Sequence, residues 1–109
     1  MTTLTIPSYL SEQEVIDLNK DLSKDFLEVC GIKDNDTYIV LGAGLGSCMF
    51  TIPDDYQHKP DLTVFHTHPI EAEPSDLDIS VVQQLCISME VFTPNNKYII
   101  ISECDQHDM

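Results

Sequence analysis

Two histidines and one aspartate in the middle of the chain have the residue types and the spacing of a metal site. His66 and His68 are two positions apart in an apolar, β-branched run that Pro69 ends. On a strand such residues point to the same face, close to the strand's end. Asp78 follows after nine intervening residues, in the first turn of an expected helix that Ser75 caps, so its carboxylate can turn back toward the strand. Two imidazoles and one carboxylate form a three-ligand zinc set, whose open fourth position can hold the water of a hydrolytic site.

Each part of this pattern also has a simpler interpretation. Two histidines on one strand face are often only polar surface, and Ser75-x-x-Asp78 is a capping-box variant with which any helix could begin. All the parts occur in this order within 13 residues. We therefore favour the metal site over the simpler interpretation.

The elements that must position these side chains are predicted from hydrophobic spacing. Residues 11–30 predict a helix that Ser11 and Glu14 begin as a capping box and Gly31 ends. A second helix is expected over residues 75–90, and a turn over residues 94–96. Strands are expected at residues 37–41, 48–52, 62–68 and 97–102.

The last of these strands is apolar throughout and is therefore expected at the centre of the sheet. The order of elements predicts one α+β domain, residues 1–109, in which helices pack on a mixed sheet and a polar tail begins near residue 103. A glycine-rich stretch, residues 42–46, precedes a strand pattern rather than a helix. A phosphate loop joins a strand to a helix, so a hairpin turn or a bulge is expected here instead.

The charge of the chain excludes several classes of partner. The 109 residues include 19 acidic side chains, 5 lysines and no arginine, which gives a formal net charge of −14. Proteins that bind a phosphate backbone or an anionic membrane surface need a basic face, so we expect neither nucleic acid nor membrane as a partner. The acidity is typical of a solvated surface, and its alternatives are a basic partner or mimicry of DNA.

The cysteines and the N-terminus predict a cytoplasmic protein. Cys30, Cys48, Cys86 and Cys104 are scattered and form no C-x-x-C pair. Residues 1–10 contain no basic segment followed by a long apolar run. Reduced and partly buried thiols are therefore expected, without a secretory signal.

The motif H-x-H-P at residues 66–69, followed by P-S-x-x-D at residues 74–78, resembles the JAMM motif of the JAB/MPN zinc metalloproteases. That family also has an N-terminal helix that leads into Glu-x-Cys-Gly, which residues 28–31 match, and a helix and a hydrophobic strand after the Asp. In the order of elements the resemblance covers residues 11–102. It implies a JAB/MPN-like mixed β-sheet, flanked by the N-terminal helix and by a second helix after the metal-binding loop.

The resemblance also implies a role for each motif residue. His66, His68 and Asp78 would ligate Zn²⁺. Glu28 would be the general base that takes a proton from the attacking water and passes it to the leaving amine, and Ser75 would donate a hydrogen bond to the oxyanion. The implied activity is that of a zinc-dependent peptidase or isopeptidase that cleaves after the C-terminal tail of a ubiquitin-like modifier or in a related protein substrate. Such tails are often basic, and an acidic enzyme would attract them.

Three features depart from the pattern of the family. The gap between His68 and Asp78 is one residue shorter than usual, and Glu28 comes only 38 residues before His66. The chain also has no room for the insertions with which eukaryotic deubiquitinases hold ubiquitin, so it resembles a minimal prokaryotic or phage-type core.

Two other functions stay open beside the peptidase. One is a catalytically silent MPN-type scaffold module, which the first two departures allow. The other is an acidic decoy that occupies a nucleic-acid-binding surface, which only the net charge suggests. Glu71 and Glu73, beside the motif, are either an acidic rim for a basic substrate tail or ordinary loop surface.

Overall fold

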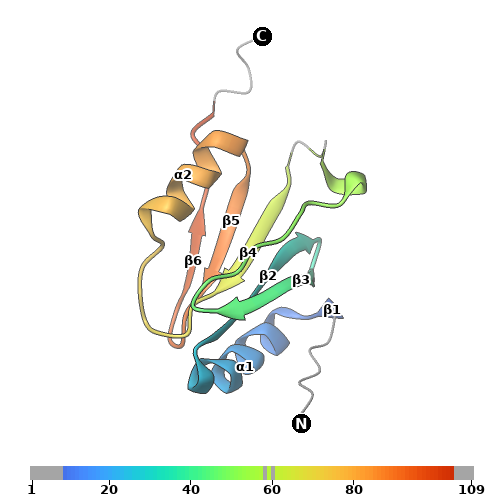
Figure 1. Ribbon diagram of the computed structural model, residues 1–109. Coiled ribbons are helices and arrows are strands. Elements are labelled where there is room, and N and C mark those ends of the chain that lie inside the picture. The colour runs from blue at the N-terminus through green and yellow to red at the C-terminus, as the bar shows by residue number, and fades with distance from the viewer. Residues whose placement is uncertain (1–8, 58, 60, 105–109) are drawn as a thin grey trace.

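A computed structural model describes residues 9–57, 59 and 61–104, and these form a six-stranded sheet with two α-helices (Figure 1). The helices are α1 (Glu12–Leu22) and α2 (Asp76–Leu85), with short 3-10 turns η1 (Ser23–Asp25) and η2 (Asp54–Tyr56). The strands are β1 (Tyr9–Leu10), β2 (Leu27–Asp34), β3 (Thr37–Leu45), β4 (Thr63–Thr67), β5 (Ser88–Phe92) and β6 (Lys97–Ile100). Their order in the sheet is β1-β3-β2-β4-β5-β6, and β4 and β5 are parallel while the other pairs are antiparallel. The prediction of an α+β fold with a mixed sheet is confirmed.

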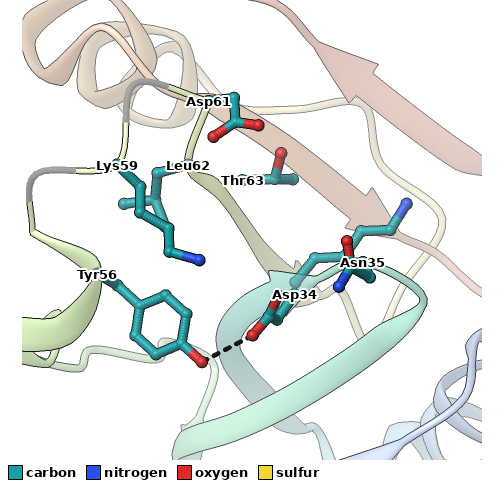
Figure 2. Close-up of a pocket in the computed structure, with 8 residues that line it drawn as sticks. Asp34, Asn35, Tyr56, Lys59, Asp61, Leu62 and Thr63 are labelled. Atoms are coloured by element: carbon teal, nitrogen blue, oxygen red, sulfur yellow. Dashed lines mark hydrogen bonds between the residues drawn. The ribbon is translucent and has the colours of Figure 1, made fainter.

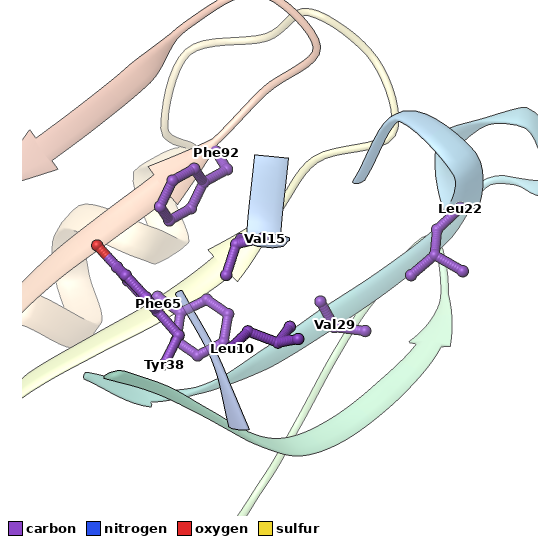
Figure 3. Packing of buried hydrophobic residues seen from close by; sticks show 7 residues of the cluster. All are labelled: Leu10, Val15, Leu22, Val29, Tyr38, Phe65 and Phe92. Atoms are coloured by element: carbon purple, nitrogen blue, oxygen red, sulfur yellow. The ribbon is translucent and has the colours of Figure 1, made fainter. Parts of the chain in front are cut away.

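The two helices pack on opposite faces of this sheet. Successive residues of a strand point to opposite faces, and Phe65 and Val64 of β4 accordingly belong to different cores. The core on the α1 face consists of Leu10, Val15, Leu22, Val29, Tyr38, Phe65 and Phe92 (Figure 3). The core on the α2 face consists of Ile32, Leu62, Val64, Val82, Ile87, Met89 and Val91.

The α1 face is held by aromatic packing and by ion pairs. The rings of Tyr38, Phe65 and Phe92 meet edge to face, with centroids 5.1, 5.4 and 6.4 Å apart, and each such contact is worth about 0.5–1.5 kcal/mol beyond the area it buries. Glu90 of β5 lies on the same face. Its carboxylate accepts hydrogen bonds from the Tyr38 hydroxyl at 2.5 Å and from Lys33 at 2.9 Å, and lies 3.1 Å from Lys97 Nζ.

The first helix is shorter than predicted, although its capping box of Ser11 and Glu14 is confirmed. The α-helix ends at Leu22, and Phe26 adopts a left-handed conformation with φ 57° that turns the chain into β2. Glu28 therefore lies on a strand and not on a helix. The helical spacing of the apolar residues was misleading because residues 27–34 pair with β3 on one side and with β4 on the other.

The second helix is also shorter than predicted. It ends at Leu85, and Cys86 has a left-handed φ of 55°. Residues 88–92, predicted in part as helix, form β5 instead, where parallel pairing with β4 buries four of the five side chains. The turn at residues 94–96 joins β5 to β6 and is confirmed, as is the strand predicted at residues 62–68, which the structure has as β4.

Two further expectations about strands were wrong. Among the residues that the structure describes, strand β6 pairs only with β5, so it lies at the edge of this sheet and not at its centre. Residues 48–52 form no strand. The expectation of a hairpin turn or a bulge at the glycine-rich stretch is confirmed as a bulge at its start, where Cys30 pairs with Gly42 but Gly31 pairs with Val40, and most of the stretch lies inside β3.

The expectation of reduced thiols was wrong as well. Disulfides join Cys30 to Cys48 and Cys86 to Cys104, with Cα atoms 6.0 and 5.6 Å apart. The partner of each cysteine could not be predicted from the spacing of the cysteines in the sequence. It depends on how the folded chain, including β3 and the segment after it, places them on the sheet. The cytoplasmic prediction loses this support, since disulfides persist in oxidising surroundings. Among the described residues no helix is long and apolar enough to cross a membrane, and residues 105–109 of the predicted tail lie outside them.

Candidate metal centre

The side chains of His66 and His68 converge at the end of β4. His66 lies in the strand, and His68 follows its last residue and donates its backbone N–H to the Phe92 carbonyl at 2.7 Å. The same-face placement expected of residues two apart brings the two Nε2 atoms to 2.9 Å from each other. Because β5 holds the backbone of this segment, the two rings meet on a fixed part of the sheet.

Asp78 reaches both histidines from the first turn of α2. Its Oδ2 atom lies 3.4 Å from His66 Nε2 and 3.6 Å from His68 Nε2. The carboxylate is oriented by the capping box, in which Ser75 donates its backbone N–H to Oδ2 at 2.9 Å and Asp78 donates its own to Ser75 Oγ at 3.1 Å. The nine residues between His68 and Asp78 are therefore enough for the Asp78 carboxylate to reach both histidines.

The three atoms have the spacing of a metal ligand set. A tetrahedral zinc ion with bonds of about 2.0–2.1 Å places its ligand atoms roughly 3.3 Å apart, and the distances of 2.9, 3.4 and 3.6 Å lie on both sides of that value. His68 Nδ1 lies 3.2 Å from the Ala72 carbonyl oxygen. A carbonyl only accepts, so Nδ1 carries the proton and the lone pair of Nε2 faces the other two ligands. His66, His68 and Asp78 could thus hold a metal ion.

The charges of the group interact strongly. Burial acts to raise the pKa of the Asp78 carboxyl, but the adjacent imidazoles of His66 and His68 outweigh it and hold that pKa well below its usual range. The Asp78 carboxylate, whose Oδ2 atom lies 3.6 Å from His68 Nε2, favours the protonated imidazole and so raises the pKa of His68. A carboxylate that remains ionised is the form that binds a cation.

Glu28 lies on the face of the sheet that carries these three residues. Strands β2 and β4 pair Cys30 with His66, and the continuation of that register brings Glu28 level with His68, with its side chain on the same face. The side chain is buried, with 8% exposed. Burial raises the pKa of Glu28, while His66 and His68 act to lower it. The helical position predicted for this residue was wrong, but its strand position places it beside the metal-binding group.

Ser75 and Glu71 differ in what their side chains contact. Ser75 is exposed, and its hydroxyl oxygen accepts the Asp78 N–H, which leaves the hydroxyl proton for another acceptor. Both oxygens of Glu71 accept hydrogen bonds from the turn between β5 and β6. The donors are Thr93 Oγ1, at 2.9 and 2.8 Å, Asn95 N, at 2.9 Å, and Asn96 Nδ2, at 3.0 Å.

Glu71 therefore anchors the loop between the candidate metal ligands, and since its side chain is exposed, its role as part of an acidic rim stays a prediction. The cluster of hydrogen-bonding residues at positions 93–96 was the sequence signal for this contact. Glu73 is exposed, and its role as part of an acidic rim stays a prediction.

An apolar groove of about 360 Å³ adjoins the metal-binding residues. His66 and Asp78 line one part of it, and the other walls come from α2, from strands β4 and β5 and from residues 48–52. A second pocket, polar and of about 270 Å³, lies beside the β2–β3 turn (Figure 2). There the Tyr56 hydroxyl donates to Asp34 Oδ2 at 2.9 Å. None of the residues predicted for the site lines this second pocket.

Comparison of the chain with family models, with curated proteins and with solved structures finds no match. The resemblance to the JAB/MPN metalloproteases therefore rests on the residues of the motif alone.

Proposed function

We propose that the protein is a zinc-dependent peptidase or isopeptidase of the JAMM type. The convergence of His66, His68 and Asp78 on one point, beside the buried carboxylate of Glu28, is the observation that carries this proposal. Two imidazole nitrogens and one carboxylate oxygen are a ligand set typical of zinc in hydrolases, in which a fourth position stays open.

The proposed chemistry assigns one task to each side chain. A bound zinc ion would polarise a water molecule and lower its pKa to about 7. Glu28 would accept a proton from the attacking water and pass it to the leaving amine, which is worth a factor of roughly 10²–10⁴ in rate. The Ser75 hydroxyl, whose proton the helix cap leaves unused, would donate to the substrate's oxyanion, a contact worth about 2.7–4 kcal/mol.

The proposed substrate is a protein or peptide, including the tail of a ubiquitin-like modifier. The net charge of −14 supports a substrate with a basic segment, because complementary charge accelerates encounter and disfavours acidic competitors. The same charge argues against nucleic acid as a substrate.

The test combines zinc stoichiometry with cleavage of a panel of short peptides and modifier conjugates. Wild-type protein is expected to bind about one zinc ion per chain, as three-ligand sites do, and to cleave part of the panel. Glu28→Gln should keep the zinc but lose roughly 10²–10⁴ in rate, whereas His68→Ala should lose both. A wild-type protein that binds zinc and cleaves nothing would favour the silent scaffold module instead.

A further inference from the structure

We propose that the apolar groove is a specificity pocket that takes a large aliphatic or aromatic side chain of the substrate, next to the bond that is cleaved. This inference rests on the proposed peptidase function. The groove is continuous with the metal-binding group, since His66 and Asp78 belong to both. A substrate whose reacting carbonyl lies at that group must therefore place a neighbouring side chain at the entrance of the groove.

The size and the lining of the groove fit such a side chain. Its volume of about 360 Å³ is at the lower end of the range of about 300–1,000 Å³ for ligand pockets, which suits a side chain and adjoining backbone better than a whole cofactor. Apart from His66 and Asp78 at one end, the lining residues are uncharged. Those that form its inner surface include Phe50, Ile52, Val64, Val81, Ile87 and Met89.

The rim of the groove is also apolar. Met49, Leu77 and Leu85 line it and are 88%, 73% and 55% exposed. These side chains would be covered by an apolar ligand, and none of them could pair with a charged one. A charged substrate residue in the groove would lose its hydration without gaining a partner.

The wall formed by residues 48–52 is held in place by its own anchors. A Cβ atom at Gly42 would lie 2.5 Å from the Met49 carbonyl oxygen, so only glycine lets this segment pass so close to β3. The disulfide from Cys48 to Cys30 fixes one end of the segment. Beyond the other end, the hydrogen bond from Tyr56 to Asp34 holds η2 to β2 (Figure 2).

Because this wall is anchored, the groove is already formed before a ligand binds. The free-energy cost of ordering residues 48–52 on binding is therefore lower. The glycines and the disulfide thus acquire a function that composition alone did not suggest. They keep an apolar segment beside the metal-binding residues.

The first experiment measures binding without turnover. Zinc-loaded Glu28→Gln protein is titrated into fluorescein-labelled, acetylated hexapeptides of serine and glycine, which carry one central Leu, Phe, Gly or Asp. The Leu and Phe peptides should bind at least about tenfold more tightly than the Gly and Asp peptides, as expected for an apolar pocket.

Two matched substitutions test whether the preference for the Leu and Phe peptides comes from the groove. Leu85→Glu, added at the rim, should reduce the preference to less than about threefold by placing a charge beside the bound apolar group. Ile99→Glu is the control, because Ile99 is 60% exposed, similar to Leu85, but lies on β6 outside the lining of the groove. Equal affinities for the Leu and Gly peptides, or equal effects of the two substitutions, would overturn the inference.

A second experiment separates this inference from the proposed function. Zinc-loaded wild-type protein digests a mixed peptide library, and mass spectrometry identifies the residues on both sides of each cleaved bond. Enrichment of large apolar residues at one of these positions supports both proposals. Cleavage with glycine or charged residues there overturns the specificity and leaves the peptidase standing. Selective binding with no cleavage of any peptide overturns the peptidase, and with it the assignment of the groove to a scissile bond.

Discussion

The two faces of the sheet each bury a carboxylate, but they balance its charge in different ways. On the α1 face, Glu90 has Lys33, Lys97 and the Tyr38 hydroxyl around it. On the α2 face, the charged neighbours found for Glu28 are His66, His68 and a second carboxylate, Asp78. The first arrangement is balanced by cations within the protein, whereas the second directs two imidazole nitrogens and a negative charge at one point, where a bound cation would balance the charge.

The two faces also differ in how they are held together. The α1 face combines its ion pairs with three aromatic rings that meet edge to face. On the α2 face lie the groove, the candidate metal-binding residues and the disulfide of Cys30 with Cys48, and a second disulfide joins Cys86, which ends α2, to Cys104. An open site cannot bury its surroundings completely, and covalent links compensate for the packing that it lacks.

The largest expected difference between the faces is their response to zinc. At a zinc concentration about 1,000 times the dissociation constant, the free energy of unfolding of the wild type should rise by about 4 kcal/mol. Asp78→Asn should abolish the rise, although the amide oxygen can still accept the Ser75 N–H and keep the cap. Denaturant unfolding with zinc and with a chelator measures the effect. Glu90→Gln, on the other face, should keep the full response, and an undiminished response of Asp78→Asn would show that zinc binds elsewhere.

Removal of the charge on the α1 face should destabilise the protein with or without zinc. Glu90→Gln removes the carboxylate that pairs with Lys33 and one of the two that pair with Lys97, which keeps Glu12. We expect a loss of about 3 kcal/mol, the lower end of the range for breaking a buried ion pair, because the two lysine side chains are 26% exposed. Urea unfolding at neutral pH measures this loss. An effect no larger than that of Glu73→Gln, at an exposed position, would contradict the structural role of Glu90.

The pH dependence of this loss follows from the sign of the pKa shift. Burial acts to raise the pKa of Glu90, but the hydrogen bonds from Tyr38, Lys33 and Lys97 outweigh it and lower that pKa. The folded protein thus holds this proton less tightly than the unfolded chain, and the stabilisation is full above the ordinary value of about 4.3. It is lost as the pH falls through the lowered pKa. The difference between wild type and Glu90→Gln should therefore shrink below about pH 4, and a constant difference would contradict it.

The two disulfides allow a comparison within the α2 side of the protein. Each closes a loop with a sequence separation of 18 residues, so removal of either should cost a similar free energy of unfolding, about 3 kcal/mol by the chain-entropy estimate. Only the Cys30–Cys48 bond lies in the lining of the groove beside His66. Peptide affinity should therefore fall in the double variant Cys30→Ala with Cys48→Ala, and stay unchanged in Cys86→Ala with Cys104→Ala. Equal losses of affinity would show a general loosening of the fold.

Sequence could predict the parts of the site whose geometry is local. The placement of His66 and His68 on one face follows from the alternation of side chains along a strand. The orientation of Asp78 follows from the helix cap that Ser75 begins. Glu28 was associated with the site through a resemblance, but it was placed on the wrong element because its neighbours also fit a helical period. Its true position depends on pairing with two strands that are distant in sequence.

The parts that could not be predicted all depend on non-local contacts. Strand β5 follows α2 after only two residues, and it is a strand because β4 and β6 lie on either side of it. The partner of Cys48 depends on how closely the segment after β3 returns over Gly42. The apolar groove also depends on this close approach, because residues 48–52 form one of its walls. The hydrogen bonds of Glu71 were not predicted because its donors lie 22 to 25 residues further along the chain.

The smallest expected effect tests this role of Glu71, which joins the metal-binding loop to the turn after β5. Glu71→Ala removes the acceptor for Thr93, Asn95 and Asn96, so the loop that carries the Ala72 carbonyl, and with it the partner of His68 Nδ1, loses its anchor. Zinc affinity should fall about tenfold, the lower end of the range for partners that orient a ligand. Competition with a chelator of known affinity measures it, and Glu73→Ala in the same loop is the matched control. If both substitutions lower the affinity equally, the effect comes from lost negative charge near the site and Glu71 has no positioning role. If only Glu71→Ala lowers it, the metal-binding residues of the α2 face depend on a hydrogen-bonded anchor at the β5–β6 turn.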